Sequence, residues 1–264
     1  MCGYKVTSFK HFEGETYDAD ATLLVLAGNH LALPYIDKKP FVVNIVGAVS
    51  PAQVMMSLGR HPNFRGVIAT SLEFFNGTKE AGGRAVLLKK KYPFCEMKPS
   101  TEETQRVSSL VVRYSEYSPR HVVNGMNAFT QFTRLQKSVT FPVDNYETAI
   151  DTEVLLASRY LVHIKYWGHV CNAVVKALAL GVPVLMDAAT FQVGKYAAYV
   201  NKSNGIVFPT VEDMIKYLNN TELETYVYQK LKKYCIKHAS DHHLPHTTTD
   251  VRCFLEEEPS GETK

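Results

Sequence analysis

The sequence predicts an α/β protein with two Rossmann-like lobes, each built on a parallel sheet. Short apolar runs recur along the chain and alternate with helical patterns. The runs are continuous rather than alternating in polarity, as in strands that helices cover on both faces. A polar segment with lysines and prolines, residues 89–107, interrupts the series. We therefore expect a first lobe over residues 1–100, a second lobe over 101–252 and a flexible tail over 253–264.

Composition and charge narrow the class of protein. Of the 264 residues, 45% are hydrophobic and 21% are charged, as in ordinary globular proteins. The net charge of +3 permits an anionic ligand without requiring nucleic acid. Five widely spaced cysteines without a Cys-x-x-Cys pair favour reduced thiols over a disulfide framework or a zinc site. Since there is neither an apolar signal region nor a run of roughly 18 apolar residues, we expect a cytoplasmic protein without a membrane span.

Four apolar runs predict the strands of the first lobe. They cover residues 22–27, 41–46, 66–70 and 85–88. Ser50 and Pro51 predict a helix that continues to Leu58, because serine caps free N–H groups and proline fits the first helical position. Ser71 starts another helix, and residues 31–36 form a short helical crossover.

The second lobe continues the alternation. The expected strands cover residues 108–113, 139–141, 160–164, 182–186 and 205–208. The expected helices cover residues 121–135, 148–157, 170–180, 211–218 and 222–237. The helix at 170–180 has the clearest end, since Gly181 suits the position after the last turn and Pro183 prevents continuation.

The centre of the second lobe combines a strand, a turn and a helix start. The turn Trp167-Gly168-His169 follows the strand at 160–164 and precedes the helix at 170–180. The first N–H groups of a helix have no intrahelical partner, and the helix dipole favours negative charge there. The arrangement therefore predicts a phosphate-binding site. The alternative is an ordinary βαβ unit that carries the same turn signals.

The segment Asn172–Val184, NAVVKALALGVPV, resembles the donor-binding signature of GT-B glycosyltransferases. In that superfamily the helix ends in an acidic-Ala-x-x-x-Gly-x-Pro-Val pattern. The resemblance implies that the turn and the helix start hold the diphosphate of a nucleotide sugar and that an acidic residue holds the ribose. Here Lys176 stands at the acidic position, and Gly168 stands where many members have another glutamate.

Two further segments carry weaker resemblances. Ser158-Arg159-Tyr160 resembles the exostosin-like branch of the superfamily. The segments Asp20–His30 and Asn44–Gly47 resemble the second half of a GT-B N-terminal lobe. The resemblance implies that the opening βαβ unit of that lobe is shortened or absent, so we expect an atypical member with a shortened N-terminal lobe.

Two cations at strand ends are candidates for the donor site. Ligands of doubly wound sheets bind outside the carboxyl ends of the strands, where Arg113 and Lys165 stand. The resemblance implies that they neutralise the diphosphate leaving group, on which charge grows in the transition state. The other donor-binding candidates are Tyr166, Gly168, His169, Asn172 and Lys176. The alternatives are exposed charges at strand ends, a backbone cap for His169 and a solvated helix charge for Lys176.

The first lobe carries the acceptor-side candidates. His30, after the first strand, is the candidate base that accepts the proton of an attacking hydroxyl. Asp20 and Glu73 are carboxylate alternatives, and His30 is otherwise a structural histidine. Gly47 and Ser50 belong to a loop before a helix start, which an acceptor or a phosphate can approach closely.

Two other clusters have simpler interpretations. His238, His242 and His246 have a spacing compatible with metal ligation, but Pro245 breaks the helix that would align them. We therefore expect a solvated surface there and no metal site. A basic cluster with aromatic neighbours is compatible with nucleic acid, although a lysine-rich linker is the commoner case. It comprises Arg84, Lys89, Lys90, Lys91 and Lys98.

These features predict a metal-independent glycosyltransferase that moves a sugar from a nucleotide-sugar donor to a glycan or another hydroxyl acceptor. The nucleotide sugar is a substrate, and no cofactor is expected. One alternative is a non-catalytic Rossmann-like protein that binds a nucleotide or a partner. Another is a glycosyltransferase that modifies DNA.

Overall fold

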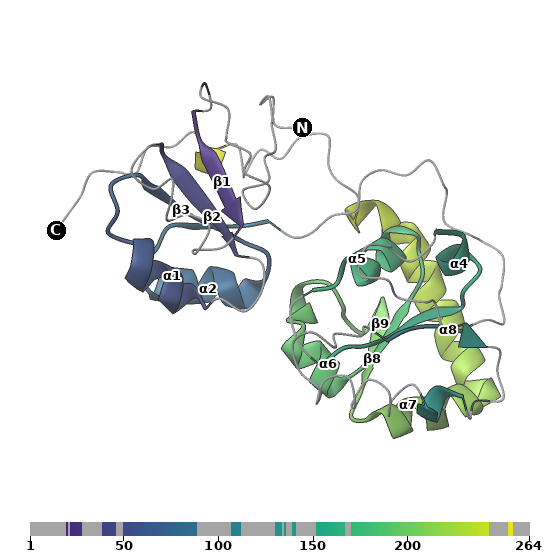
Figure 1. Ribbon diagram of the computed structural model, residues 1–264. Helices are drawn as coiled ribbons and strands as arrows, with labels where there is room; N and C mark the ends of the chain where they lie inside the picture. Colours follow the sequence, from purple (N-terminus) through teal and green to yellow (C-terminus); the bar gives the residue numbers. More distant parts are fainter. Residues whose placement is uncertain are drawn as a thin grey trace. The chain divides into compact units, whose positions relative to one another are not determined.

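The computed structural model describes two compact units (Figure 1). The first comprises residues 1–89 and 245–264, and the second comprises residues 90–244. The residues described are 20, 22–27, 39–45, 50–88, 107–111, 130–133, 135, 139–140, 152–166, 170–242 and 253–255. Each unit contains a parallel sheet, which confirms the predicted fold class of two Rossmann-like lobes.

The first unit has a sheet in the order β1-β2-β3-β4. Its strands are β1 (Leu24–Ala27), β2 (Phe41–Ile45), β3 (Phe64–Ala69) and β4 (Ala85–Leu87). Its helices are α1 (Pro51–Leu58) and α2 (Leu72–Glu80). Figure 1 shows both helices on one side of the sheet. The predicted crossover at residues 31–36 lies outside the described residues.

Serine caps determine where both helices begin. The Ser50 hydroxyl accepts a hydrogen bond from the Gln53 N–H (3.2 Å), and the Gln53 side chain accepts one from the Ser50 N–H (3.1 Å). The Ser71 hydroxyl accepts from the Phe74 N–H (3.3 Å). Each cap satisfies N–H groups that the helix itself leaves without a partner, so the predicted helix starts are confirmed.

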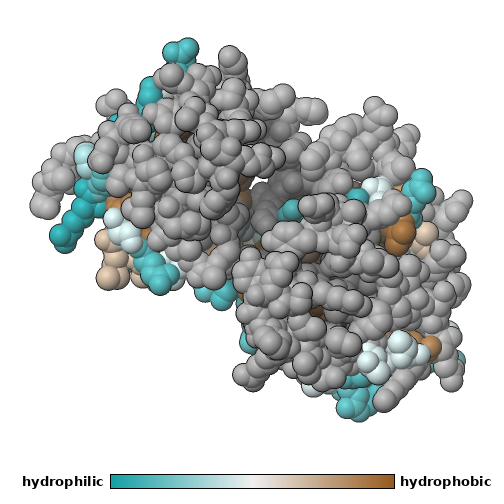
Figure 2. Space-filling model, viewed as in Figure 1, coloured by the Kyte–Doolittle hydropathy of each residue, from teal (hydrophilic) through white to brown (hydrophobic). Residues whose placement is uncertain are grey.

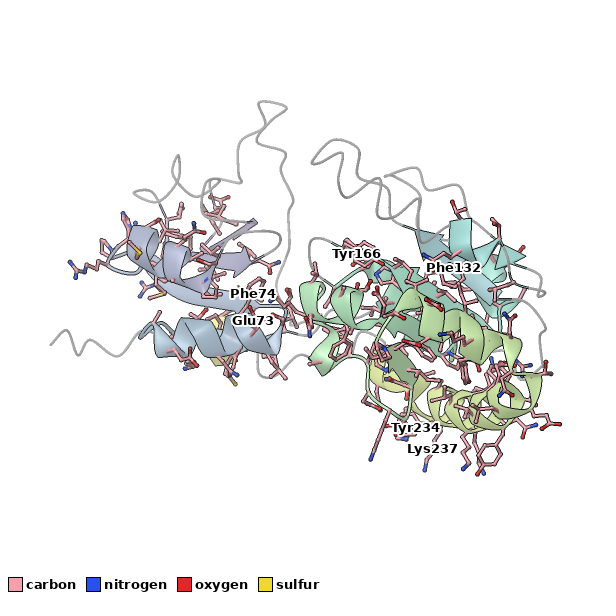
Figure 3. All side chains as sticks on the ribbon, turned by 90° about the horizontal axis from the view of Figure 1, so that it is seen from below. Glu73, Phe74, Phe132, Tyr166, Tyr234 and Lys237 are labelled. Atoms are coloured by element: carbon pink, nitrogen blue, oxygen red, sulfur yellow. The ribbon has the colours of Figure 1, made fainter. Side chains whose placement is uncertain are left out.

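The face of the sheet under α1 and α2 carries the main core of the first unit. Its fully or nearly fully buried members include Phe41, Val43, Val54, Leu58, Val67 and Phe74. Figure 3 labels Phe74, whose side chain is buried in this core, and the exposed neighbour Glu73. The alternation of buried side chains along β2 leaves Val42 on the opposite face, which needs a cover of its own.

The C-terminal segment provides part of that cover. Residues 253–255 are helical, and Phe254 packs with Val42 and Ile68. Arg84 Nη2 donates to the Phe254 carbonyl at 2.7 Å, and the guanidinium carbon lies 4.5 Å from the ring centroid. The expectation of a flexible tail is therefore wrong at residues 253–255. The physical reason is that Phe254 removes apolar surface of the sheet from water.

The second unit has a sheet in the order β6-β5-β7-β8-β9. Its strands are β5 (Val107–Val111), β6 (Val139–Thr140), β7 (Tyr160–Ile164), β8 (Val184–Asp187) and β9 (Gly205–Phe208). Its helices include α4 (Thr152–Leu156), α5 (Asn172–Ala179), α6 (Ala188–Val193), α7 (Val211–Asn219), α8 (Thr221–His238) and the 3₁₀ turns η2 (Tyr196–Ala198) and η3 (Ala239–His242). Of the predicted helix at 121–135, the described part is helical at 130–132.

Two cores cover the two faces of this sheet. Leu161 of β7 packs with Val174 and Leu178 of α5 on one face. On the other face, Tyr160 and Val162 pack with residues of α7, α8 and the segment around Phe132, which Figure 3 labels. All residues of β7 are buried as a result, as expected for a central parallel strand.

The segment after β8 differs from the sequence analysis, which expected no helix between 186 and 205. It contains α6 and η2. The start of α6 has a conventional cap, since Asp187 Oδ1 accepts from the Thr190 N–H at 2.9 Å. The helix has only 6 residues, which is too short for a hydrophobic period to be recognised in the sequence.

Figure 2 shows one face of the molecule, on which the coloured residues are largely hydrophilic and hydrophobic ones occur in small separate patches. The large apolar side chains are mostly in the cores described above. Within the described ranges, no helix combines the length and the apolar character needed to cross a membrane.

A buried ion pair attaches α8 to the start of β7. Arg159 Nε and Glu224 Oε1 lie 2.6 Å apart, with only 2% and 1% of the two side chains exposed. The Arg159 guanidinium also stacks on the Tyr228 ring, 4.0 Å from its centroid. Because both charges are removed from water, removal of either one leaves the other without its counter-charge.

We expect Phe254→Ala to destabilise the first unit by about 3 kcal/mol, because it opens a cavity against Val42 and Ile68. Hydrogen exchange of β2 and β3 peptides should accelerate, while the fluorescence of Trp167, which belongs to the second unit, should show unchanged unfolding. Cys253→Ser, at the exposed neighbouring position, is the control. Unchanged exchange in Phe254→Ala would show that the segment contributes nothing to the first unit.

We expect Arg159→Met to destabilise the second unit by about 3 kcal/mol, because the buried Glu224 carboxylate then loses the positive charge of Arg159. The double variant Arg159→Met/Glu224→Leu should recover much of this loss, since no unpaired charge remains. Urea unfolding followed by Trp167 fluorescence measures both. Equal losses in the single and the double variant would contradict the assignment of the loss to an unpaired charge.

Candidate functional site

The carboxyl ends of β7 and β8 are joined by Thr190 of α6. Lys165 follows β7 directly, and its side chain is only 7% exposed. The Lys165 N–H donates to Thr190 Oγ1 at 3.0 Å, and the Thr190 N–H donates to Asp187 Oδ1 at 2.9 Å. The end of β7 is therefore held against the start of α6, which fixes the backbone that carries the Lys165 cation.

Tyr166 extends this network. Its hydroxyl donates to Asp187 Oδ2 at 2.9 Å, so each oxygen of the Asp187 carboxylate accepts a hydrogen bond. Burial, and then the negative charge of Asp187, raises the pKa of Tyr166 above its ordinary value. The hydroxyl therefore stays protonated and remains a donor. Figure 3 labels Tyr166 in the second unit, where the sequence analysis placed a donor-binding residue.

A second chain of hydrogen bonds runs from β7 to the start of α5. His163 Nε2 and the Tyr196 hydroxyl are 2.8 Å apart, and the Cys171 N–H donates to the same hydroxyl at 3.0 Å. His163 and Tyr196 are both fully buried. Cys171 is the N-cap residue of α5, and its own side chain makes no capping hydrogen bond. Tyr196 therefore connects the central strand with the helix start.

His163 is neutral at physiological pH. Burial, and then the positive charge of Lys165, lowers the pKa of His163 to about 3. In the described part of the protein, its Nδ1 atom is buried without a hydrogen-bond partner. The positive charge at the end of β7 therefore belongs to Lys165 rather than to the imidazole.

The start of α5 has the features of an anion site. Asn172, the first helical residue, is exposed, whereas residues Ala173–Ala179 are buried. No acidic residue lies in the first turn of α5, so no carboxylate of that turn opposes an anion. The N-terminal end of the helix dipole favours negative charge at this helix start, and the Lys165 cation favours it at the end of β7.

Lys176 corrects one sequence-based interpretation. The alternative of a solvated helix charge is wrong, because Lys176 is only 5% exposed. The reason is that α5 is covered by β7 and β8 and by α8 and η3, so that most of its circumference is interior. A buried lysine replaces the acidic residue that the resemblance expects at this position.

The other predicted site residues have different outcomes. Ser50 belongs to the first unit, and its hydroxyl accepts the capping hydrogen bond of α1. Asp20 and Glu73 are exposed residues of the same unit. Five candidates lie outside the described residues: His30, Gly47, Arg113, Gly168 and His169.

The two remaining clusters are described only in part. His238 Nδ1 lies 3.0 Å from Asp241 Oδ2, and no group of three or more His, Cys, Asp or Glu residues among those described is able to hold a metal ion. His246 lies outside these residues. Arg84 of the basic cluster binds the Phe254 carbonyl, and its four lysines are not described.

Three residues of the site were not identified from the sequence as contributors: His163, Tyr196 and Thr190. A signal existed for His163, since a histidine in the middle of an apolar strand must find a polar partner inside the fold. Asp187 before Ala-Ala-Thr was a recognisable N-cap signal for α6. Nothing in the local sequence marks Tyr196, whose role depends on residues distant in the chain.

Comparison with known proteins gives structural similarity at low sequence identity. The structure of HepE from Anabaena in complex with UDP and glucose has a TM-score of 0.61 and 15% identity, over 85% of this chain and 74% of that chain. WaaG, a glycosyltransferase involved in lipopolysaccharide biosynthesis, has a TM-score of 0.56 and 13% identity, over 94% and 80%. The pneumococcal O-GlcNAc transferase GtfA in complex with UDP and GlcNAc has a TM-score of 0.55 and 9% identity, over 84% and 54%.

These neighbours are GT-B glycosyltransferases, and at this identity they establish the fold of the chain. No protein-family model matches the sequence, and no curated protein does. The resemblance to the exostosin-like branch and the shortened first lobe stay predictions.

We expect the stability of the second unit to fall as pH decreases below 6.5, the ordinary pKa of histidine, towards about 3, the pKa of His163 in the fold. In this window the unfolded chain binds a proton that the folded protein does not, so acid favours unfolding. At pH 5 this proton binding lowers the free energy of unfolding of the second unit by about 2 kcal/mol. His163→Gln removes it, so its urea midpoint should depend less on pH than that of the wild type.

His163→Leu is a second variant that removes the same titrating group, so its urea midpoint should likewise depend less on pH than that of the wild type. The same pH dependence in His163→Gln and wild type would contradict the burial of a neutral His163.

Proposed function

We propose that the protein is a glycosyltransferase whose nucleotide-sugar donor binds with its diphosphate where β7 ends and α5 begins. The observation that carries this proposal is the buried Lys165 at the carboxyl end of β7, which is followed in the chain by a helix whose first turn has no acidic residue. Ligands of doubly wound sheets bind at the carboxyl ends of strands. The GT-B fold of the chain supports the proposal, since HepE and GtfA have this fold and their structures contain UDP.

The chemistry of the reaction explains the need for a cation at this position. The acceptor oxygen forms a bond to the anomeric carbon of the sugar, while the bond from that carbon to the diphosphate breaks. Negative charge grows on the departing diphosphate, and Lys165 stabilises it, whereas the start of α5 binds the diphosphate equally before and during transfer. The acceptor proton passes to a base, for which His30 is the candidate. Arg113 is the candidate for a second cation.

The hydrogen bonds of Thr190 and Tyr166 make this site rigid. They hold the backbone of Lys165 and the carboxylate of Asp187 before any ligand arrives. A charge that is already in place requires little reorganisation as the transition state forms, which is the basis of electrostatic catalysis. The proposal assigns neutralisation of the diphosphate to protein cations, so transfer should not require a divalent metal.

Lys176 favours one alternative, a protein that binds a nucleotide without turnover. An ammonium group has only donors, so Lys176 is unable to accept hydrogen bonds from ribose hydroxyls as a carboxylate does. Lys176 is also buried, and its ammonium group replaces the carboxylate that the resemblance expects at this position of α5. If this change abolishes catalysis, the donor should bind without being hydrolysed or transferred.

We expect one class of nucleotide sugar to stabilise the second unit in a screen of UDP, GDP, CDP, ADP and dTDP sugars. At 100 times its dissociation constant, a ligand stabilises the folded state by about 2.7 kcal/mol. UDP sugars are the first choice, because the structures of HepE and GtfA contain UDP. Lys165→Met keeps the aliphatic volume but removes the charge, so it should weaken binding by at least about tenfold.

Lys216→Met is the matched control, because Lys216 is an exposed lysine of α7 that pairs with Glu212. It should bind the donor like the wild type. Release of the nucleotide and transfer to glycan acceptors, measured with and without EDTA, then separates catalysis from binding alone. The donor-site assignment is wrong if no nucleotide sugar stabilises the wild type, or if both lysine variants bind equally well.

A further inference from the structure

The start of α5 is held by a side chain from another part of the fold. N-cap residues normally satisfy the first N–H groups of a helix with their own side chains, but Cys171 does not. The Cys171 N–H instead donates to the Tyr196 hydroxyl at 3.0 Å. Tyr196 belongs to η2, which follows α6 in the chain, so the helix start depends on a segment beyond β8.

The Tyr196 hydroxyl is in turn located by β7. It lies 2.8 Å from His163 Nε2, and the two rings meet edge to face with centroids 5.5 Å apart. Because the Tyr196 hydroxyl accepts a hydrogen bond from the Cys171 N–H, its own proton remains available for donation to His163 Nε2. Two contacts from different elements therefore determine the position of one oxygen atom, and through it the position of the α5 start relative to the strand.

The backbone before Tyr196 is adapted to this placement. Lys195 has a left-handed conformation with φ of 57°, which non-glycine residues seldom adopt. At Gly194, a Cβ atom would lie 2.0 Å from Tyr196 Cε2, so only glycine leaves room for the ring. Such local constraints persist where the surrounding structure requires them. Here the conformation of Lys195 and the lack of a Cβ atom at Gly194 allow the Tyr196 ring to lie against His163 and its hydroxyl to contact Cys171.

We propose that Tyr196, located by His163, is a positioning residue for the donor site: it holds the start of α5 where its N–H groups meet the donor diphosphate. This inference rests on the proposed function, because it assumes that the diphosphate binds there. Tyr196 is fully buried and belongs to η2, outside the site itself. It acts through the backbone of Cys171, so it affects binding of the donor and not the chemical step.

Tyr196→Phe tests the proposal, because it removes only the hydroxyl. Tyr217→Phe is the matched control: the Tyr217 hydroxyl is also in a buried pair, 3.1 Å from that of Tyr160, on the opposite face of the sheet from α5. Both variants should lose stability. The dissociation constant of UDP, or of the nucleotide diphosphate that the screen identifies, is measured by calorimetry at a temperature at which both variants are folded.

We expect Tyr196→Phe to raise this dissociation constant and the KM for the nucleotide sugar by about tenfold, because a displaced helix start misplaces the N–H groups. Its kcat should change by less than about twofold, since the acceptor and the cation are unaffected. Tyr217→Phe should leave the dissociation constant, the KM and the kcat unchanged. Hydrogen exchange of the peptide that contains Cys171 should accelerate in Tyr196→Phe alone.

Variants of His163 provide a rescue experiment. His163→Gln places an amide near the position of Nε2 and can keep the hydrogen bond to Tyr196, so UDP affinity should stay within about twofold of the wild type. His163→Leu leaves Tyr196 without this contact and should weaken UDP binding in the same direction as Tyr196→Phe.

The outcomes separate this proposal from the proposed function. If the wild type binds no nucleotide, the proposed function fails and the positioning role fails with it. If the wild type binds and Tyr196→Phe binds equally well, the positioning role alone is wrong. Equal weakening by Tyr196→Phe and Tyr217→Phe also overturns it, because the effect is then a general loss of stability.

Discussion

β7 is buried on both faces, and the organisation of the candidate site follows from this constraint. A central strand has no access to water, so each polar group on it or at its end must find a partner inside the protein. His163 meets this requirement at Nε2 through Tyr196, while its Nδ1 has no partner among the described residues, and the backbone N–H of Lys165 meets it through Thr190. Thr190 and Tyr196, the two partners, belong to the segment between β8 and β9 in the sequence. Their hydrogen bonds therefore join that segment to the central strand.

The same contacts determine the electrostatics of the site. Burial keeps His163 neutral, so the positive charge at the end of β7 belongs to Lys165. Asp187 is close in the network, but both of its oxygens accept hydrogen bonds, from Tyr166 and from the start of α6. A cation at a hydrogen-bonded strand end, and a helix start that Tyr196 links to the same strand, are an arrangement that favours an anionic ligand.

The two units are stabilised by contacts between residues far apart in the sequence. In the second unit, Arg159 before β7 binds Glu224 in the first turns of α8. In the first unit, Phe254 covers the face of the sheet opposite α1 and α2, and Arg84 holds its backbone. The second unit is the continuous stretch 90–244, whereas the first combines residues 1–89 with residues 245–264, so only the first unit is made of two separate stretches of the chain.

The sequence by itself determined the elements whose cause is local. The apolar run of β7 and the serine caps of α1 and α2 depend on neighbouring residues, and they were predicted closely. Only the tertiary structure decided that Lys176 is buried, that Phe254 belongs to a core and that Tyr196 meets His163. The physical reason is that burial and hydrogen-bond pairing depend on which elements pack together, whereas the spacing of apolar and capping residues reports only on the adjacent backbone.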